Sequence, residues 1–234
     1  MPGWRSAKHA KQWTNTLKAY AYPVFGALPV QQIDVALVMR MLEPIWTAKT
    51  VTAGRVRGRV EAILDWAATR GYRRGENPAR WKGQLENLLS KRSKVSKVKH
   101  HPALPYQEIG TFMAALRAGE GAAARALEFT ILTAARTGEV TGARRGELDG
   151  EAKIWTVPKG RTKGEKEHRV PLSAPATAVT KLMLKFDRTE FIFPGGRAQK
   201  SLSENAMLAP LERMGRDDIT VHGFRSTFRD WAAE

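Results

Sequence analysis

Basic side chains recur at helical spacing in the stretch "ITVHGFRSTFRDWAAE", residues 219–234. His222 and Arg225 are three residues apart and Arg229 is four further on, so a helix would place all three on roughly one face. Guanidinium groups bind phosphate oxygens as fixed forks, and an imidazole exchanges protons near neutral pH. This face therefore has the chemistry to bind and act on a phosphate group, although His-x-x-Arg alone is a weak motif that chance often supplies.

The other side of the same predicted helix is aromatic. Phe224, Phe228 and Trp231 follow the spacing of an inward-facing stripe. We predict that these three rings anchor the helix in a hydrophobic core and leave His222 and Arg225 facing a ligand. Arg229 receives no role.

A further arginine stands where a buried helix is expected to break. The stretch "FTILTAAR" is apolar almost all round, ends at Arg136 and is soon followed by Gly138. A permanently charged side chain in this place needs an anionic partner, and Glu139 is the nearest candidate. A plain structural ion pair and a site for an anionic ligand both fit the pattern.

The elements that must position these residues are mostly helices. Apolar periodicity predicts one helix over residues 33–43, ended by Pro44, and another in "TAGRVRGRVEAILDWAATRGY", stopped by Gly71. The period then switches to that of strands in "AKIWTVP" and "HRVPLS", joined by the polar tip "KGRTKGEKE", with "FIFP" as a third short strand. Farther on, "SLSENAMLAPLERMG" predicts a helix with Ser201 and Glu204 in capping-box order and a kink or break at Pro210.

Composition limits the possible partners. The 234 residues and seven tryptophans allow two domains with separate cores. Lys+Arg total 39 against 23 for Asp+Glu, a net charge of +16, and residues 1–100 contribute 19 basic and 6 acidic residues, or +13 of it. Nucleic acid is the expected partner of such a surface, the alternative being a basic protein with no particular partner. Without cysteine, histidine ligand spacing or a long apolar run, we expect no metal, no membrane span and a cytoplasmic protein.

Two groups of basic residues are candidates for DNA contact. Arg55 and Arg59 are four residues apart and share one helix face, which either lies on phosphates or is merely solvated. Residues 87–107 contain no acidic residue and read as a basic linker. Its basic residues are Lys91, Arg92, Lys94, Lys97 and Lys99.

Three stretches resemble a known family when taken together in this order: "TILTAARTGEVTGARRGELD", "GRTKGEKEHRVPLS" and "ITVHGFRSTFRDWAAE". They look like the catalytic domain of tyrosine recombinases, specifically phage and genomic-island integrases of the lambda integrase superfamily. The stretch from "WRSAKHAKQW" to "RGENPARW" is similar to their core-binding domain. The resemblance implies a mainly α fold, with a helical core-binding domain over residues 1–90, a basic linker over 91–104, and over 105–234 a mostly helical catalytic domain with a small antiparallel sheet.

The resemblance also implies catalytic roles. Arg136 and Arg225 match the two arginines that grip the non-bridging oxygens of the scissile phosphate, where one well-placed donor is worth about 10² to 10³ in rate. His222 matches the histidine that assists as proton acceptor and phosphate donor. Glu139 matches the acidic residue that steadies the first arginine.

The resemblance places a general acid on the hairpin tip. Lys163 is the choice for the lysine that protonates the leaving hydroxyl, by its place relative to "HRVPLS". Lys159 and Lys166 share the same tip, and two of the three lysines are then merely solvated.

The family attacks DNA with a tyrosine that lies beyond the His-x-x-Arg motif. The tyrosines of this sequence are Tyr20, Tyr22, Tyr72 and Tyr106, all upstream. We therefore expect the 234 residues to lack the nucleophile, the catalytic domain to be incomplete at its C-terminus, and the chain itself to be inactive in cleavage. Two explanations stay open: a fragment of a longer integrase, or a truncated gene whose product binds DNA without cutting it.

The resulting hypothesis is a site-specific DNA recombinase that cleaves and rejoins strands through a phosphotyrosyl intermediate, integrating or excising a phage or genomic island. The covalent link conserves the bond energy, so no nucleotide cofactor or metal is expected. The resemblance implies double-stranded DNA as partner, a homotetramer on that DNA, and a place at the nucleoid of a bacterial cytoplasm. The alternative is a non-catalytic DNA-binding protein, either an integrase remnant or a regulator.

Overall fold

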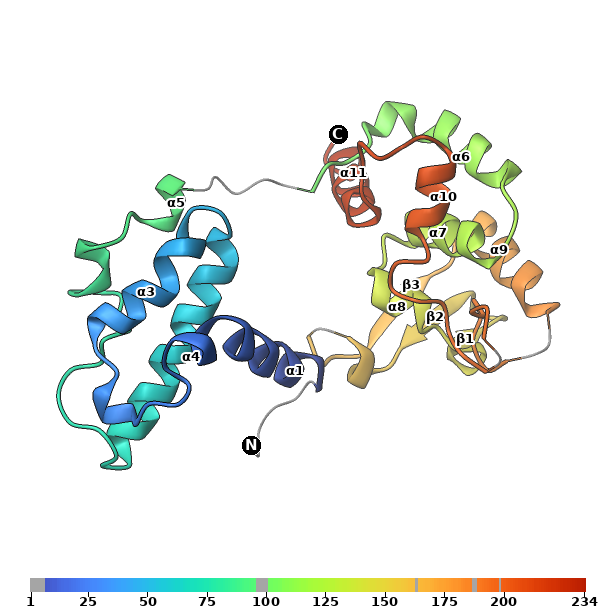
Figure 1. The fold of residues 1–234 in the computed structure, drawn as a ribbon. Coiled ribbons are helices and arrows are strands. Elements are labelled where there is room, and N and C mark those ends of the chain that lie inside the picture. The colour runs from blue at the N-terminus through green and yellow to red at the C-terminus, as the bar shows by residue number, and fades with distance from the viewer. Residues whose placement is uncertain (1–6, 96–100, 163, 187–188, 198) are drawn as a thin grey trace. The chain divides into compact units, whose positions relative to one another are not determined.

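The chain forms two compact units, Met1–Lys99 and His100–Glu234, each with its own hydrophobic core (Figure 1). The structure is a computed structural model that describes residues 7–95, 101–162, 164–186, 189–197 and 199–234. Both units are mainly helical, and the second carries a small antiparallel sheet, as the sequence predicts. No helix in the described ranges has the length and apolar character needed to cross a bilayer.

The first unit is a set of helices around the pair α3 and α4. Its helices are α1 (Ala7–Thr16), the π-helical turn Leu17–Ala21, α2 (Tyr22–Phe25), the 3₁₀ turn Val30–Gln32, α3 (Val35–Trp46), α4 (Thr50–Thr69), the 3₁₀ turn Leu85–Asn87 and α5 (Arg92–Val95). The Asp34 carboxylate caps α3 by accepting a hydrogen bond from the Leu37 N–H at 2.9 Å. α4 buries Val56, Val60 and Leu64 on one stripe.

The predicted ends of these two helices have different outcomes. α4 ends at Thr69, and Gly71 follows with a φ of +74°, a left-handed conformation that glycine adopts without steric cost. α3 does not end at Pro44 but continues to Trp46. Ile45 and Trp46 are buried, and packing of this last turn offsets the hydrogen bond that the proline lacks.

The second unit surrounds α7, whose side chains are buried on most sides. Its helices are α6 (Ile109–Ala118), α7 (Ala122–Thr133), α8 (Thr137–Thr141), α9 (Ala174–Leu184), α10 (Leu208–Arg213) and α11 (Phe224–Ala232), with 3₁₀ turns Tyr106–Glu108, Arg145–Glu147, Lys159–Arg161 and Val221–Gly223. The fully buried ring of Phe129 on α7 lies 5.2 Å from Trp155 and 5.5 Å from Phe193, centroid to centroid. α7 therefore joins the helical and sheet portions of this core.

The sheet has the order β1-β2-β3, all antiparallel, with β1 at Leu148–Asp149, β2 at Ile154–Val157 and β3 at His168–Pro171. Trp155 pairs with Leu148 on one side and Val170 on the other. The expectation of a third strand at "FIFP" is wrong, because Phe191 and Pro194 make only isolated bridges. The third strand is instead β1, which directly precedes the predicted turn. In that turn the Asp149 carboxylate accepts hydrogen bonds from the N–H groups of residues 151 and 152 and closes the hairpin.

Two predictions for the last part of the chain are also wrong. The helix expected from Ser201 begins only at Leu208, so Pro210 lies in its first turn, where a missing N–H is tolerated. α11 is anchored by Phe224, which is 3% exposed, whereas Phe228 and Trp231 are 44% and 59% exposed and contact each other. Only the first turn of α11 is held by the core, through the Phe224 ring against Phe112 and a hydrogen bond from the Thr227 hydroxyl to the Leu104 carbonyl.

Candidate active site and nucleic-acid interface

Arg136 lies at the break between α7 and α8. α7 ends at Thr133, and Ala134 takes a left-handed conformation with a φ of 49° that turns the chain. The Glu139 carboxylate accepts hydrogen bonds from the Arg136 backbone N–H at 3.0 Å and from its Nη1 at 2.7 Å. The carboxylate is 2% exposed and the Arg136 side chain 43%. A buried anion thus holds a guanidinium whose outer part faces solvent, where it can bind a phosphate.

Arg225, in the first turn of α11, contacts the same break between α7 and α8. Its Nη1 donates a hydrogen bond to the carbonyl oxygen of Ala134, two residues before Arg136. This contact ties α11 to the turn between α7 and α8. The structure therefore places the two predicted phosphate-binding arginines at one junction, although they are far apart in the sequence.

His222 lies in the 3₁₀ turn that precedes α11 and is exposed. The turn is packed against the chain at 101–104: the Thr220 N–H donates to the Pro102 carbonyl at 3.1 Å. A Cβ added to Gly223 would lie 2.0 Å from that carbonyl oxygen, so only glycine fits there. This packing fixes the position of His222 relative to Arg225.

His101 is a second imidazole beside His222 that the sequence did not single out. The two ring centroids are 4.8 Å apart with planes at 70°, an edge-to-face arrangement. No local spacing connects the two residues, so the sequence held no signal for the pair. His101 is exposed and joins the predicted site as an additional polar ring.

The hairpin between β2 and β3 is fastened to α8 by an arginine that sequence reasoning missed. Arg161 Nη2 donates to the Glu139 carbonyl at 3.0 Å and to the Glu147 carboxylate at 3.1 Å. Burial lowers the pKa of Arg161 from its ordinary value, and the Glu147 carboxylate opposes that shift. Gly142 makes room for this side chain, since a Cβ there would lie 2.6 Å from Arg161 Nη1.

The structure describes two of the three predicted lysines of the hairpin, Lys159 and Lys166. Lys163 lies outside the described residues. The Thr162 hydroxyl donates to the carbonyls of Lys159 and Lys166 at 3.1 and 2.7 Å, which closes the base of the tip, and both lysines have polar, solvent-accessible positions. Across the described ranges, no group of three or more His, Asp or Glu residues is arranged to hold a metal ion.

The predicted DNA-contacting residues of the first unit fall into two classes. Arg55, Lys91, Arg92 and Lys94 are exposed, the last three in or beside α5. Arg59 is buried, and its Nη1 donates to the Gln12 carbonyl at 2.8 Å and to the Thr16 hydroxyl. Burial lowers the pKa of Arg59, with a further contribution from neighbouring positive charge. The prediction that Arg59 contacts DNA is therefore wrong, because its buried guanidinium joins α1 to α4 inside the unit.

Comparison with known proteins shows which family the sequence matches. Residues 1–84 match the model of the phage integrase central domain, and residues 103–234 match that of the phage integrase family. Curated relatives include the prophage integrase IntZ of Escherichia coli K12, 34% identical over 97% of this chain and 55% of that protein. The integrase of Enterobacteria phage P4 is 29% identical over 96% of this chain and 54% of that protein. The chain spans about half the length of the curated relatives it matches.

Solved structures share the fold. A lambda integrase dimer bound to a COC′ core site superposes with a TM-score of 0.72 at 16% identity, covering 95% of this chain and 81% of that one. The Tn1549 transposon integrase in complex with transposon right end DNA gives 0.74 at 12% identity, covering 99% and 82%. With family models matching both units and the fold shared along nearly the whole length, the chain belongs to the phage integrase family of tyrosine recombinases.

Proposed function

We propose that the chain forms the DNA-binding and phosphate-activating parts of a site-specific DNA recombinase. One observation carries the proposal: Arg225 donates to the carbonyl of Ala134 while the buried Glu139 carboxylate holds Arg136, so two guanidinium groups are fixed at one junction. Fixed cations of this kind stabilise the charge that develops on phosphate oxygens in a pentavalent transition state. The buried carboxylate keeps Arg136 oriented before the DNA arrives.

In the proposed mechanism a tyrosine attacks the phosphodiester and forms a phosphotyrosyl link, which a hydroxyl of the partner strand later reverses. Arg136 and Arg225 bind the non-bridging oxygens, and His222 accepts a proton and donates to the phosphate. Lys163 protonates the leaving hydroxyl; this role rests on the family resemblance alone. Because the link conserves the bond energy, the reaction proceeds without a nucleotide or metal cofactor.

The nucleophile of this reaction is not expected among the tyrosines of the sequence, all of which precede His222. Tyr106 lies in the same unit, and its hydroxyl donates a hydrogen bond to the Glu234 carboxylate. That bond raises the pKa of Tyr106 and so disfavours the phenolate that an attack requires. The raised pKa of Tyr106 is also consistent with a second candidate function, a DNA-binding protein without strand cleavage.

Double-stranded DNA is the proposed substrate, and four protomers the proposed assembly on two DNA sites. Among the similar structures are lambda and Tn1549 integrases bound to DNA and a lambda integrase tetramer bound to a Holliday junction. A recombinase of this kind would work in the bacterial cytoplasm, where the chromosome lies. Integration or excision of a phage or genomic island is the proposed biological outcome.

A suicide DNA substrate, which traps the covalent intermediate, tests the proposal in the product of the complete gene. We expect an adduct that falls at least about 100-fold in formation rate on Arg136→Ala or Arg225→Ala. Arg229→Ala is the matched control, because Arg229 lies on the same helix and, among the described residues, its side chain bonds only to the adjacent Asp230 carboxylate, at 2.8 Å. An adduct formed undiminished by the Arg225 variant contradicts the assignment, and DNA binding with no adduct supports the second candidate.

A further inference from the structure

Arg161 lies at the tip of the β2–β3 hairpin, yet its guanidinium bonds to two other segments of the second unit. Its Nη2 donates to the Glu139 carbonyl oxygen on α8 at 3.0 Å and to Glu147 Oε2 at 3.1 Å. Glu147 Oε2 also accepts a hydrogen bond from Nε1 of the fully buried Trp155 at 3.0 Å. One nitrogen of Arg161 therefore fastens the hairpin both to α8 and to a carboxylate that the core holds in place.

Glu139 connects this contact to the predicted phosphate-binding site. Its carboxylate, which is 2% exposed, holds Arg136 Nη1 at 2.7 Å, while its backbone carbonyl accepts from Arg161. One residue thus bonds to the predicted phosphate-binding arginine through its side chain and to the hairpin through its main chain. A shift of the hairpin relative to α8 would change its distance from a phosphate held by Arg136.

The same hairpin carries the predicted general acid. Lys163 itself lies outside the described residues, but it follows Arg161 by two residues in the sequence, so covalent geometry keeps the two Cα atoms within about 7 Å of each other. Proton transfer requires the donor within hydrogen-bonding distance of the acceptor, and a misplacement of about 1 Å can slow a reaction about 100-fold. The fastening at Arg161 therefore limits how far the lysine can move from its proton acceptor.

We propose that Arg161 is a positioning residue for the general-acid step, because it fastens the hairpin of Lys163 to the element that holds Arg136. The inference rests on the recombinase function proposed above. In that step the tyrosine oxygen forms a bond to phosphorus, the bond from phosphorus to the leaving oxygen breaks, and this oxygen takes a proton from the lysine ammonium. Arg161 contacts none of the reacting atoms and acts through the lysine.

A DNA substrate with sulfur in place of the leaving oxygen tests this role in the product of the complete gene. A thiol has a pKa of about 8.5, so the sulfur departs as a thiolate and needs no proton from the lysine. We expect Arg161→Ala to slow formation of the covalent adduct about 10- to 100-fold on the oxygen substrate and less than about 3-fold on the sulfur substrate, each relative to the parent. Equal slowing on both substrates refutes the role, because a defect in folding or phosphate binding would not depend on the leaving atom.

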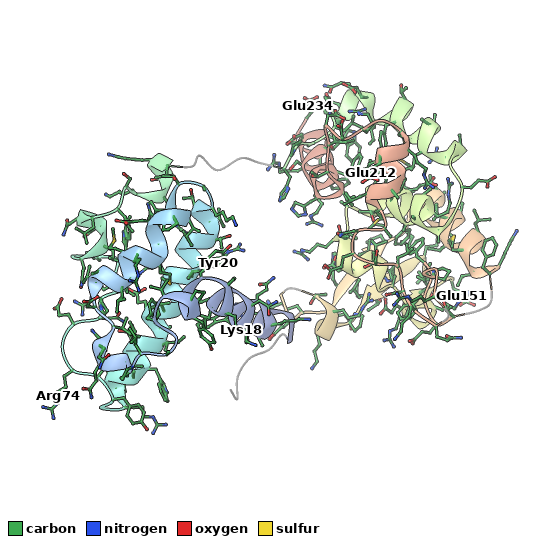
Figure 2. The ribbon with its side chains drawn as sticks, in the orientation of Figure 1. Lys18, Tyr20, Arg74, Glu151, Glu212 and Glu234 are labelled. Carbon is green, nitrogen blue, oxygen red and sulfur yellow. The ribbon has the colours of Figure 1, made fainter. Side chains whose placement is uncertain are left out.

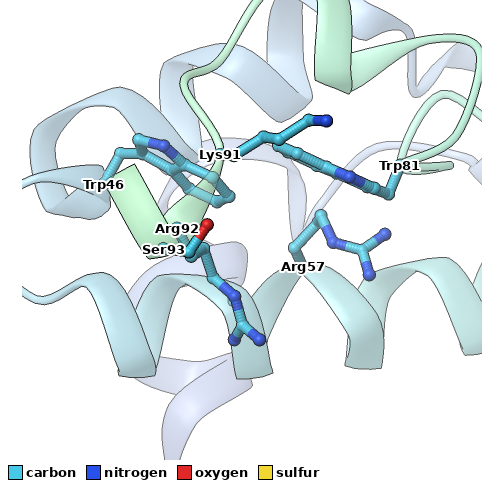
Figure 3. Close-up of a pocket in the computed structure, with 7 residues that line it drawn as sticks. Trp46, Arg57, Trp81, Lys91, Arg92 and Ser93 are labelled. Atoms are coloured by element: carbon cyan, nitrogen blue, oxygen red, sulfur yellow. The ribbon is translucent and has the colours of Figure 1, made fainter. Parts of the chain in front are cut away.

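Arg57 of the first unit provides a matched control (Figure 3). Its Nη1 also donates to one carboxylate and one backbone carbonyl, those of Glu61 at 2.7 Å and Ala79 at 2.8 Å. The Arg57 side chain is 17% exposed, against 22% for Arg161. Arg57→Ala removes comparable bonds from a unit that carries none of the predicted catalytic residues, so any slowing should be the same on the two substrates.

Gly142→Ala displaces the guanidinium of Arg161 without removing its charge. The added Cβ would lie 2.6 Å from Arg161 Nη1, the end of a flexible side chain that can move aside while the fold is kept. We expect slowing of about 3-fold or more on the oxygen substrate, again recovered by sulfur. Gly146→Ala adds a Cβ with nothing within 4 Å and should react as the parent does. If Arg161→Ala does not fold, equal rates for these two glycine variants on the oxygen substrate refute the role.

Lys163→Ala separates this inference from the proposed function. If the parent forms no adduct on either substrate, the recombinase function is wrong and the inference with it. If the parent reacts and sulfur does not recover Lys163→Ala, the general-acid assignment and the inference are wrong, while the roles of Arg136 and Arg225 stand. If sulfur recovers Lys163→Ala but not Arg161→Ala, only the positioning role is refuted. Adding Arg161→Ala to Lys163→Ala should cause no further slowing, because the two changes act through one group.

Discussion

Arg225 and Ala134 are 91 residues apart in the sequence, yet the guanidinium of one donates a hydrogen bond to the carbonyl oxygen of the other. The bond is possible because Ala134 is left-handed and ends α7, which leaves its carbonyl outside the helical ladder. A backbone atom, unlike a side chain, has little freedom to move away. The Arg225 guanidinium is therefore held by a main-chain atom two residues before Arg136.

Glu139→Gln removes the buried charge that holds Arg136. We expect a loss of about 1–2 kcal/mol in the free energy of unfolding, below the usual cost for a buried pair because Arg136 is 43% exposed. Urea denaturation of the variant measures the loss. Glu190→Gln is the control, since the Arg144–Glu190 pair is about half exposed on both sides and its loss should cost less than about 0.5 kcal/mol. Equal losses in the two variants would contradict the anchoring role of Glu139.

Gly223→Ala tests the packing of the turn that carries His222. The added Cβ would lie 2.0 Å from the Pro102 carbonyl oxygen, and a backbone atom cannot rotate aside as a side chain does. We expect a loss of about 1–3 kcal/mol in the free energy of unfolding, typical of overpacking. Gly146→Ala, in another short 3₁₀ turn with nothing within 4 Å of the added atom, should be close to neutral. Parallel denaturant titrations compare them, and a neutral Gly223→Ala would refute the tight fit.

Removal of the second imidazole tests whether His101 orients His222. An edge-to-face pair is worth about 0.5–1.5 kcal/mol, so His101→Ala should slow adduct formation about 2- to 10-fold in the product of the complete gene. His101→Phe keeps an aromatic ring in place and should recover most of the rate. If Phe is as slow as Ala, the imidazole acts through its nitrogens rather than through ring packing.

Arg161→Met tests the attachment of the hairpin to α8. The substitution removes both hydrogen bonds to residues 139 and 147 and leaves the largely buried Glu147 carboxylate without its cation, so hydrogen exchange over residues 158–162 should accelerate. Arg169→Met, an exposed position on β3, serves as the control and should leave that exchange unchanged. Slow exchange in the Arg161 variant would mean that other contacts hold the hairpin.

Tyr106→Phe tests the assignment of the nucleophile. Because the Glu234 carboxylate raises the pKa of Tyr106, its neutral phenol form persists to higher pH than in an ordinary tyrosine. A tyrosine held in this form is a poor nucleophile, and in the product of the complete gene the phenylalanine variant should give an unchanged yield of covalent DNA adduct. Loss of the adduct would make Tyr106 the nucleophile. Spectroscopic titration of the phenol in Glu234→Gln should show a pKa shifted back towards the ordinary value.

Local spacing predicted those parts of the site that neighbouring residues build. Arg136 and Glu139 are three residues apart and bond across the first turn of α8, so their pairing could be read from the sequence. Contacts between distant segments could not. Arg55 and Arg59 have the same helical spacing, yet Arg59 is buried because Gln12 and Thr16, more than 40 residues away, receive its hydrogen bonds.

The same limit explains the errors in the fold. The periodicity of Phe224 and Phe228 predicted one buried stripe, but only the first turn of α11 meets the core. The acidic and basic side chains labelled in Figure 2 are exposed, as charged residues usually are. The need for glycine at 223 was hidden from the sequence, because it arises from the backbone of Pro102, which lies far away in the chain.

Gly223 has an ordinary helical φ of −58°, so its backbone conformation is open to any residue. What restricts the position is volume, set by the path of the chain at 102–103. We expect a side chain at 223 to be tolerated only when that path also changes. We therefore expect substitutions at position 223 to occur together with changes at 102–103, although the two segments are more than 100 residues apart.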